Sequence, residues 1–364
     1  MPSLVTFGEI MARVEPPAPY RFAQALPGIA RISFAGAEAN VAAAYALLGG
    51  SSAFISALPQ GPLADACVAY LRAVGVDTSR IVRRPQGRLG MFFLEAGACQ
   101  RPSTVWYDRA GSTIALLGPE QYEWQVLLNG ARRLHISGIT PALSAAAAAS
   151  ALECVRRAKA AGLFVSIDLN FRKKLWDWKP GVTAQELARD VVGGMLKFVD
   201  LVIGNEEDAA DVLGITAGKT DVEKGELDVE RYPDVARQIA KRYPNVSMVA
   251  FTLRESISAS HNNWGAMFWT RADDQGYCAP MRDGRYQPYA ITDIVDRVGG
   301  GDSFAGSLLF ALDDPELSGQ PAACVAFAAA ASCLCHTIPG DFNFVSRAEV
   351  LSLMRGNASG RVRR

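Results

Sequence analysis

The sequence predicts an α/β fold: a three-layer, doubly wound, mostly parallel sheet with a small β-lid. Two observations support this prediction. Between residues 134 and 253, short apolar segments alternate with helix-like segments, which is the spacing of parallel strands joined by crossover helices. Segments 12–34 and 88–110 break the alternation with proline-rich or aromatic, strand-like patterns. We expect these two segments to form a separate sheet over a cleft.

The individual elements are assigned in chain order from these patterns. Strands are expected at 5–10, 53–58, 91–94, 105–107, 134–138, 164–168, 201–204 and 246–253. Helices are expected from Gly36 to Gly49-Gly50 and at 63–74, 144–161, 186–198, 206–213, 303–312 and 321–335. The expected core therefore comprises 1–11, 35–87 and 111–364, and the lid comprises 12–34 and 88–110. We expect the charged segment 216–232 and the basic end 356–364 to lie on the surface.

Composition narrows the class of protein. The 364 residues carry no net charge and 49% are hydrophobic, so we expect a large core and neither a nucleic-acid nor a membrane partner. The apolar run 321–335 is shorter than the roughly 18 residues of a membrane span. Seven cysteines, and a first segment patterned as a strand rather than a secretory leader, indicate free thiols in the cytoplasm. We interpret the cluster Cys333, Cys335 and His336 as core packing, not a zinc site.

Three consecutive glycines, Gly299 to Gly301, precede Asp302 and form the most informative local pattern. The small and apolar residues 303–312 that follow indicate a buried helix. The glycines would then lie at its N-terminus, where free N–H groups and the helix dipole favour an anion. Asp302 could be a simple N-cap, but three glycines exceed what a cap needs. We favour a general base beside a phosphate site.

The segment Val298–Phe304 resembles the C-terminal signature of the ribokinase-like sugar kinases. In that family the Asp deprotonates a sugar hydroxyl, and the glycine N–H groups hold the transferring phosphate. The resemblance therefore implies that Asp302 is the base and that Gly299, Gly300 and Gly301 stabilise the phosphoryl group. It also implies a ribokinase-like fold and the use of ATP and Mg²⁺.

A second glycine-led turn, Gly36 to Asn40, is similar to the sugar-binding signature of the same family, in the form found in 2-keto-3-deoxygluconate kinases. Ala35 stands where relatives usually have a further glycine. Segments 107–110, 137–141 and 168–172 match the same subfamily. The resemblance implies that the following residues bind the sugar: Gly36, Asn40, Phe92, Tyr107, Arg109, Ile139, Arg172 and Asp341. Phe92 stands where many of these kinases have tyrosine.

Two arginines bear on the kind of sugar. Arg109 near Tyr107 suits a carboxylate, because a planar fork and a phenol donor can bind it together, although a charge on a surface strand gives the same pattern. Arg172 follows an expected strand, where ligands bind in open α/β sheets. If both arginines meet one carboxylate, the substrate is an acidic sugar. A neutral sugar would leave both without a partner.

The nucleotide and metal site is indicated by two further segments. Asn205 to Asp208 resembles the family's Asn-x-x-Glu element, which implies that Asp208 helps to hold Mg²⁺ indirectly, through water; a helix start that favours acids is the alternative. Thr252 and Arg254 replace a turn that is richer in glycine in many relatives, and with Asn205 they are expected to bind the nucleotide. Segment 214–220 resembles a Walker A loop but has three intervening residues, and we interpret it as a surface loop.

Together these motifs predict ATP-dependent phosphorylation of 2-keto-3-deoxygluconate at its terminal hydroxyl. The alternative within the family is a fructokinase or another neutral-sugar kinase. The alternative of a different class is a non-catalytic sugar-sensing module, which the intact Asp302 and glycines disfavour. A dinucleotide-binding dehydrogenase is disfavoured because no Gly-x-Gly-x-x-Gly follows the first strand. Lids of this family often pair between subunits, so we expect a homo-oligomer, a dimer or higher.

Overall fold

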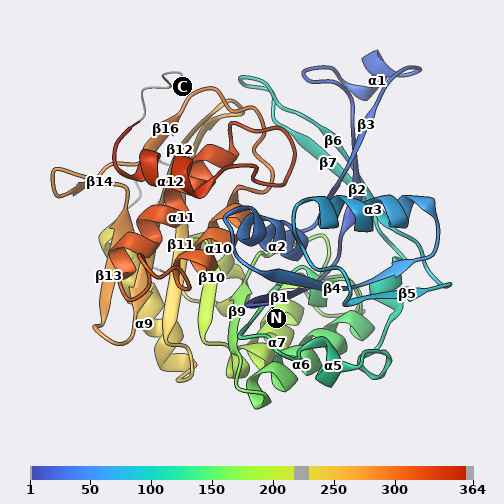
Figure 1. Cartoon of the computed structure of the whole chain (residues 1–364), viewed down its shortest axis with the longest axis horizontal. Coiled ribbons are helices and arrows are strands. Elements are labelled where there is room, and N and C mark those ends of the chain that lie inside the picture. Colours follow the sequence, from blue (N-terminus) through green and yellow to red (C-terminus); the bar gives the residue numbers. More distant parts are fainter. Residues whose placement is uncertain (1, 217–228, 358–364) are drawn as a thin grey trace.

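The computed structural model describes residues 2–216 and 229–357, and a large twisted sheet runs through its middle (Figure 1). The strand order is β13-β12-β11-β10-β9-β8-β1-β4-β5, and β16 pairs with β12. The strands are β1 (Leu4–Phe7), β4 (Ser52–Pro59), β5 (Ile81–Arg84), β8 (Arg133–Ser137), β9 (Phe164–Asp168), β10 (Leu201–Gly204), β11 (Met248–Ser258), β12 (His261–Thr270), β13 (Gln275–Ala279) and β16 (Tyr289–Ile291). Every neighbouring pair from β5 to β11 is parallel.

Helices cover both faces of this sheet and complete the three predicted layers. One face carries α2 (Ala37–Leu47), α3 (Pro62–Ala73), α10 (Gly300–Ala311), α11 (Pro321–Cys335) and α12 (Arg347–Met354). The other face carries α4 (Thr113–Leu116), α5 (Trp124–Leu127), α6 (Ala145–Ala160), α7 (Ala184–Met195) and α9 (Tyr232–Arg242). The central strands are apolar on both sides because both of their faces are buried; β1 and β10 are buried along their whole length.

A second sheet rises over one end of the first, with α1 (Phe22–Ala25) at its tip (Figure 1). Its order is β3-β2-β6-β7, formed by β2 (Met11–Glu15), β3 (Arg31–Ala35), β6 (Gly90–Glu95) and β7 (Thr104–Asp108). The two segments expected to form the lid, 12–34 and 88–110, thus pair with each other through β2 and β6. That this sheet moves as a lid separate from the core stays a prediction.

The structure differs from the expected strands in one boundary and one omission. The first strand ends at Phe7 rather than at residue 10, because the chain leaves the main sheet at Gly8 and enters the second sheet at Met11. The antiparallel edge formed by β12, β13 and β16 was not foreseen.

No helix in the described part of the chain is long and apolar enough to cross a membrane. The expectations for 214–220, 216–232 and 356–364 fall largely outside the described residues.

Candidate active site

The carboxyl ends of the parallel strands meet along one edge of the main sheet, and the segments that follow them line a cavity of about 510 Å³. Glu9 follows β1, Ile139 follows β8, Asn170 follows β9 and Asn205 follows β10. The start of α10 and the inner face of the second sheet complete the wall. Every site residue predicted from the sequence lines this one cavity.

The three glycines form the start of α10, as predicted, although the helix begins at Gly300 rather than at residue 303. Gly299 is the N-cap and has a φ of 84°, a left-handed conformation that favours glycine. A Cβ on Gly299 would lie 2.7 Å from the carbonyl oxygen of Asp341, so the turn packs directly on that backbone. A Cβ on Gly301 would meet nothing within 4 Å. The first-turn N–H groups have no acceptor within the helix and are oriented to bind an anion.

Asp302 stands in the first turn of α10 and borders the cavity. Burial, together with the charges of Asp341 and Glu38, raises the pKa of its carboxyl to about 7. A hydrogen bond from Asn40 Nδ2 to Asp302 Oδ2 (2.7 Å) opposes this shift, as does the charge of Arg172. A carboxylate with a pKa near neutrality is suited to accepting a proton at physiological pH.

Asn40 connects two helix starts, which the prediction of a sugar contact did not anticipate. Its Oδ1 accepts a hydrogen bond from the N–H of Gly36, the N-cap of α2, at 3.2 Å, while its Nδ2 donates to Asp302. A Cβ on Gly36 would lie 2.0 Å from the carbonyl oxygen of Glu9, which explains why this turn requires glycine.

Glu38 is buried beneath this junction. Its Oε1 accepts hydrogen bonds from the N–H and hydroxyl of Ser137 (2.9 and 2.7 Å) and from the hydroxyl of Thr140 (2.7 Å). Burial raises its pKa, and these hydrogen bonds oppose the shift. Its Oε2 has no partner among the described residues. The motif containing Gly36 and Asn40 includes Glu38, but nothing in the sequence indicated that its carboxyl would be buried.

The lid contributes Phe92, Tyr107 and Arg109. Phe92 is 4% exposed and offers no hydrogen-bond donor, and its ring is tilted against that of Tyr107 at 6.0 Å. Arg109 lies over the Tyr107 ring, at 5.3 Å from its centroid. Its guanidinium also forms a buried ion pair with Glu9, and Nε donates to Glu9 Oε2 at 2.7 Å. Sequence reasoning missed this pair because the two residues are 100 positions apart.

Arg172 and two buried aspartates face the cavity after β9 and β10. Arg172 is exposed and donates to the carbonyl oxygen of Phe171 (2.9 Å); it forms no ion pair with a carboxylate of the described residues. Asp208, in the short helix α8 (Glu206–Asp208), accepts from the N–H groups of Phe171 and Asn205 at 2.9 and 3.3 Å. The pKa values of Asp168 and Asp208 are raised by burial, and the charge of Asp208 raises that of Asp168 further.

The cavity is also lined by Asn205, Thr252 and Arg254, the predicted nucleotide-binding residues, and by Arg297. Arg297 donates to Asn262 Oδ1 at 2.9 Å. Its pKa is lowered by burial and by the nearby positive charge of Arg254. Two arginines that repel each other create a positive potential suited to phosphates. Arg297 was not among the predicted site residues. It is adjacent to Asp296 in the sequence, but no motif distinguished it from an arginine on the surface.

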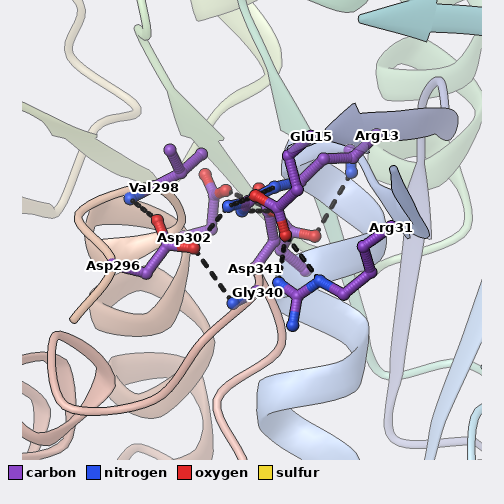
Figure 2. Close-up of polar contacts among 10 residues, drawn as sticks. Arg13, Glu15, Arg31, Asp296, Val298, Asp302, Gly340 and Asp341 are labelled. Carbon is purple, nitrogen blue, oxygen red and sulfur yellow. Dashed lines mark hydrogen bonds and ion pairs between the residues drawn. The ribbon is translucent and has the colours of Figure 1, made fainter. Parts of the chain in front are cut away.

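A buried arginine joins the lid to the loops around the glycine turn (Figure 2). Arg13 in β2 donates to Glu15 and Asp296 at 2.5 Å and to Asp341 at 2.6 Å. Asp341 lines the cavity, so its predicted contact with the sugar stays a prediction. Its Oδ1 accepts from Arg13, and burial raises the pKa of its carboxyl to about 6. Arg13 itself was missed, because a pairing over 328 residues leaves no local signal.

A doubly wound sheet with a buried carboxylate at a helix start led by glycines is an arrangement suited to phosphoryl transfer. Comparison identifies the family: a profile of the pfkB family carbohydrate kinases matches residues 1–243, and the chain belongs to this family. It is therefore a sugar kinase, with a nucleotide as phosphoryl donor.

Three relatives show the range of similarity within this family. The chain is 32% identical over 359 residues to the 2-dehydro-3-deoxygalactonokinase of Haloferax volcanii, covering 98% of each chain. The crystal structure of 2-dehydro-3-deoxygluconokinase from Thermotoga maritima matches with a TM-score of 0.86 at 40% identity, covering 98% of this chain and all of that one. Fructokinase-2 of Solanum lycopersicum is 25% identical over 360 residues, covering 98% of this chain and 97% of its own.

The pKa of Asp302 leads to a prediction about pH. Since this pKa is about 7, kcat/KM should fall with decreasing pH below about 7, approaching tenfold per unit, because a protonated carboxyl cannot accept a proton. Asn40→Leu removes the hydrogen bond that lowers the pKa, so the acidic limb should move to higher pH. Initial rates between about pH 5 and 9 measure both effects. An unchanged limb in the variant would show that another group controls it.

Proposed function

We propose that this sugar kinase uses ATP to phosphorylate the terminal hydroxyl of 2-keto-3-deoxygluconate, which is also called 2-dehydro-3-deoxygluconate. The observation that carries this proposal is Asp302, with its raised pKa, at the start of the helix led by glycines, within a cavity that also holds Arg172. Among the described residues, no carboxylate forms an ion pair with Arg172. The names of the Haloferax and Thermotoga relatives support the sugar class, since their substrates differ only in the configuration of one carbon.

In the proposed reaction the sugar's terminal O–H donates its proton to the Asp302 carboxylate. The alkoxide oxygen that forms attacks the γ-phosphorus of ATP, the bond to the β-phosphate oxygen breaks, and ADP leaves. The N–H groups of Gly299, Gly300 and Gly301 would stabilise the charge on the transferring group. Catalysis comes mainly from positioning and preorganised electrostatics, as in other phosphoryl transfers.

Mg²⁺ fits the cavity beside Asp168 and Asp208 as an ion that arrives with the nucleotide. Burial raises the pKa values of both carboxyls and the charge of Arg172 only partly opposes the shift, so a divalent ion there would stabilise their charged forms. Both oxygens of Asp208 already accept backbone hydrogen bonds, so we assign it to the metal through water. When bound, the ion neutralises negative charge on the phosphates.

We assign the sugar carboxylate to Arg172 and give Arg109 a supporting role. The guanidinium of Arg172 forms no ion pair with a carboxylate of the described residues, whereas that of Arg109 forms an ion pair with Glu9. The sequence led us to expect both arginines at one carboxylate; the ion pair between Arg109 and Glu9 favours Arg172 as the direct contact. Arg109 then orients Tyr107, over which it stacks, as a donor to the sugar.

The second candidate is a fructokinase. The apolar Phe92 favours it, because the cavity there offers no hydroxyl donor where many acidic-sugar kinases have one. The match to a tomato fructokinase over nearly the whole chain favours it as well. Arg172 weighs against it, because a neutral sugar provides no charge for this side chain. A non-catalytic sugar sensor is disfavoured, since it would have no use for a base at the glycine turn.

The first prediction concerns the base. Asp302→Asn keeps the side-chain shape but cannot accept the proton, so kcat should fall by on the order of 10²–10⁴. Sugar affinity, measured by calorimetry, should stay near the wild-type value. Turnover close to wild type would remove Asp302 from the mechanism.

The second prediction concerns the carboxylate. Arg172→Ala should lower kcat/KM for 2-keto-3-deoxygluconate by roughly ten- to a hundredfold, because a charge-assisted hydrogen bond contributes about 1.5–3 kcal/mol. The loss for fructose should be much smaller. Lys173→Ala, at the exposed neighbouring cation, is the matched control and should leave both values near wild type. Equal losses for both sugars would support the fructokinase alternative.

We also propose that the enzyme is a dimer formed through the outer face of the second sheet. Ile32, Val14, Phe93 and Trp106 are paired across the four strands, so they form one apolar row on the same face. Ile32 and Trp106 are 55% and 49% exposed. A second copy would cover this row.

Sedimentation equilibrium should give a dimer for the wild type. Trp106→Glu, which places a charge in the apolar row, should give a monomer. A monomeric wild type would contradict the proposal.

The proposed setting is the cytoplasm. All seven cysteines are free thiols in the structure, and a reducing compartment would keep them so. Cell fractionation is the test, and recovery of the protein in an oxidising compartment would contradict this assignment.

A further inference from the structure

Arg13 is a buried cation shared by three segments that are distant in the chain. It lies in β2 of the second sheet and is 1% exposed. Its guanidinium contacts Glu15 on the same strand, Asp296 before the glycine turn and Asp341 after α11, at 2.5, 2.5 and 2.6 Å (Figure 2). Glu15 is paired in turn with the more exposed Arg31 of β3. Breaking a buried ion pair leaves uncompensated charges, so these contacts constrain all three segments strongly.

The two aspartates that Arg13 contacts determine the shape of the glycine turn. Asp296 Oδ1 accepts a hydrogen bond from the N–H of Val298 (3.1 Å), and its Oδ2 accepts from the N–H of Gly340 (3.0 Å). Asp296 therefore ties the start of the turn to the loop that carries Asp341. Because the backbone of Asp341 packs against Gly299, a shift of either aspartate would move the turn.

The inner face of the second sheet links Arg13 to residues that are expected to bind the sugar. Arg13 is paired with Phe92 across β2 and β6, and Phe92 is paired with Tyr107 across β6 and β7. Residues paired in this way project from the same face of a sheet, so Arg13 lies in one row with two lining residues of the cavity. A displacement of this row relative to the core is transmitted directly to the glycine turn through Arg13.

We propose that Arg13 is a positioning residue that couples the placement of the lid to the alignment of the phosphoryl-binding turn and of Asp302. It touches neither sugar nor nucleotide in this role; it acts through Asp296 and Asp341. The inference rests on the proposed phosphoryl transfer at Asp302 and adds to it a reason why a correctly placed lid is needed for turnover. Only arginine suits this position, because a single planar fork reaches three carboxylates.

The test compares Arg13→Gln and Arg13→Lys with the matched control Arg31→Gln, which removes the other arginine on Glu15 and leaves Arg13 in place. Both Arg13 variants should lose roughly ten- to a hundredfold in kcat, with the KM for ATP within about threefold of wild type, because displaced groups slow transfer more than they weaken binding. Arg31→Gln should stay within about twofold in both constants. Wild-type kcat in a folded Arg13→Gln, or restored kcat in Arg13→Lys, would overturn the proposal.

Hydrogen exchange without any substrate separates this proposal from the assignment of the sugar. Amides in segments 296–302 and 339–342 should exchange faster in Arg13→Gln than in wild type, and at the wild-type rate in Arg31→Gln. This holds whichever sugar the enzyme phosphorylates, and unchanged exchange in Arg13→Gln would refute the coupling. If Arg13→Gln does not fold, Asp296→Asn, which keeps an acceptor oxygen, provides the kinetic test, and wild-type kcat in that variant would refute the coupling as well.

Discussion

The hydrogen bond from Asn40 to Asp302 is the interaction on which the site depends. It joins the starts of α2 and α10, which come from the two ends of the chain, 262 residues apart. Each start is a glycine turn pressed against other backbone, at Glu9 in one case and at Asp341 in the other. Side chains would keep these segments apart, so glycine brings the two N-termini together and Asn40 orients the carboxylate between them.

Burial then gives this site its electrostatic character. Four carboxyls that line the cavity have pKa values above their usual range, Asp168, Asp208, Asp302 and Asp341, and so has the buried Glu38. Asp341 forms an ion pair with Arg13. The charge of Arg172 lowers the pKa values of Asp168, Asp208 and Asp302 without a direct ion pair among the described residues. The pKa of about 7 lets the Asp302 carboxyl exchange a proton near neutral pH. Arg254 and Arg297 line the same cavity, and their like charges create a positive potential suited to phosphates.

The sequence predicted those features whose signals are local. Alternating strands and helices, glycine turns and strand-end motifs are each encoded within a few residues, so the layers, the second sheet and the start of α10 followed from the pattern. Pairings between distant residues could not be foreseen: Glu9 with Arg109, and Arg13 with Asp296 and Asp341. The antiparallel β12, which lies between β11 and β13, was missed because its direction depends on pairing with strands elsewhere in the chain, and its polar start, His261 to Asn263, hides the apolar run that follows.

We propose that this enzyme transfers a phosphoryl group from ATP to the terminal hydroxyl of an acidic keto-sugar. Phosphorus NMR of the product mixture, with ATP and an equimolar mixture of 2-keto-3-deoxygluconate and fructose, is the direct test. We expect ADP together with a phosphomonoester whose phosphorus couples to the two protons of a terminal CH₂ in the acidic sugar. A product derived from fructose alone, or one phosphorylated at a secondary carbon, would contradict it.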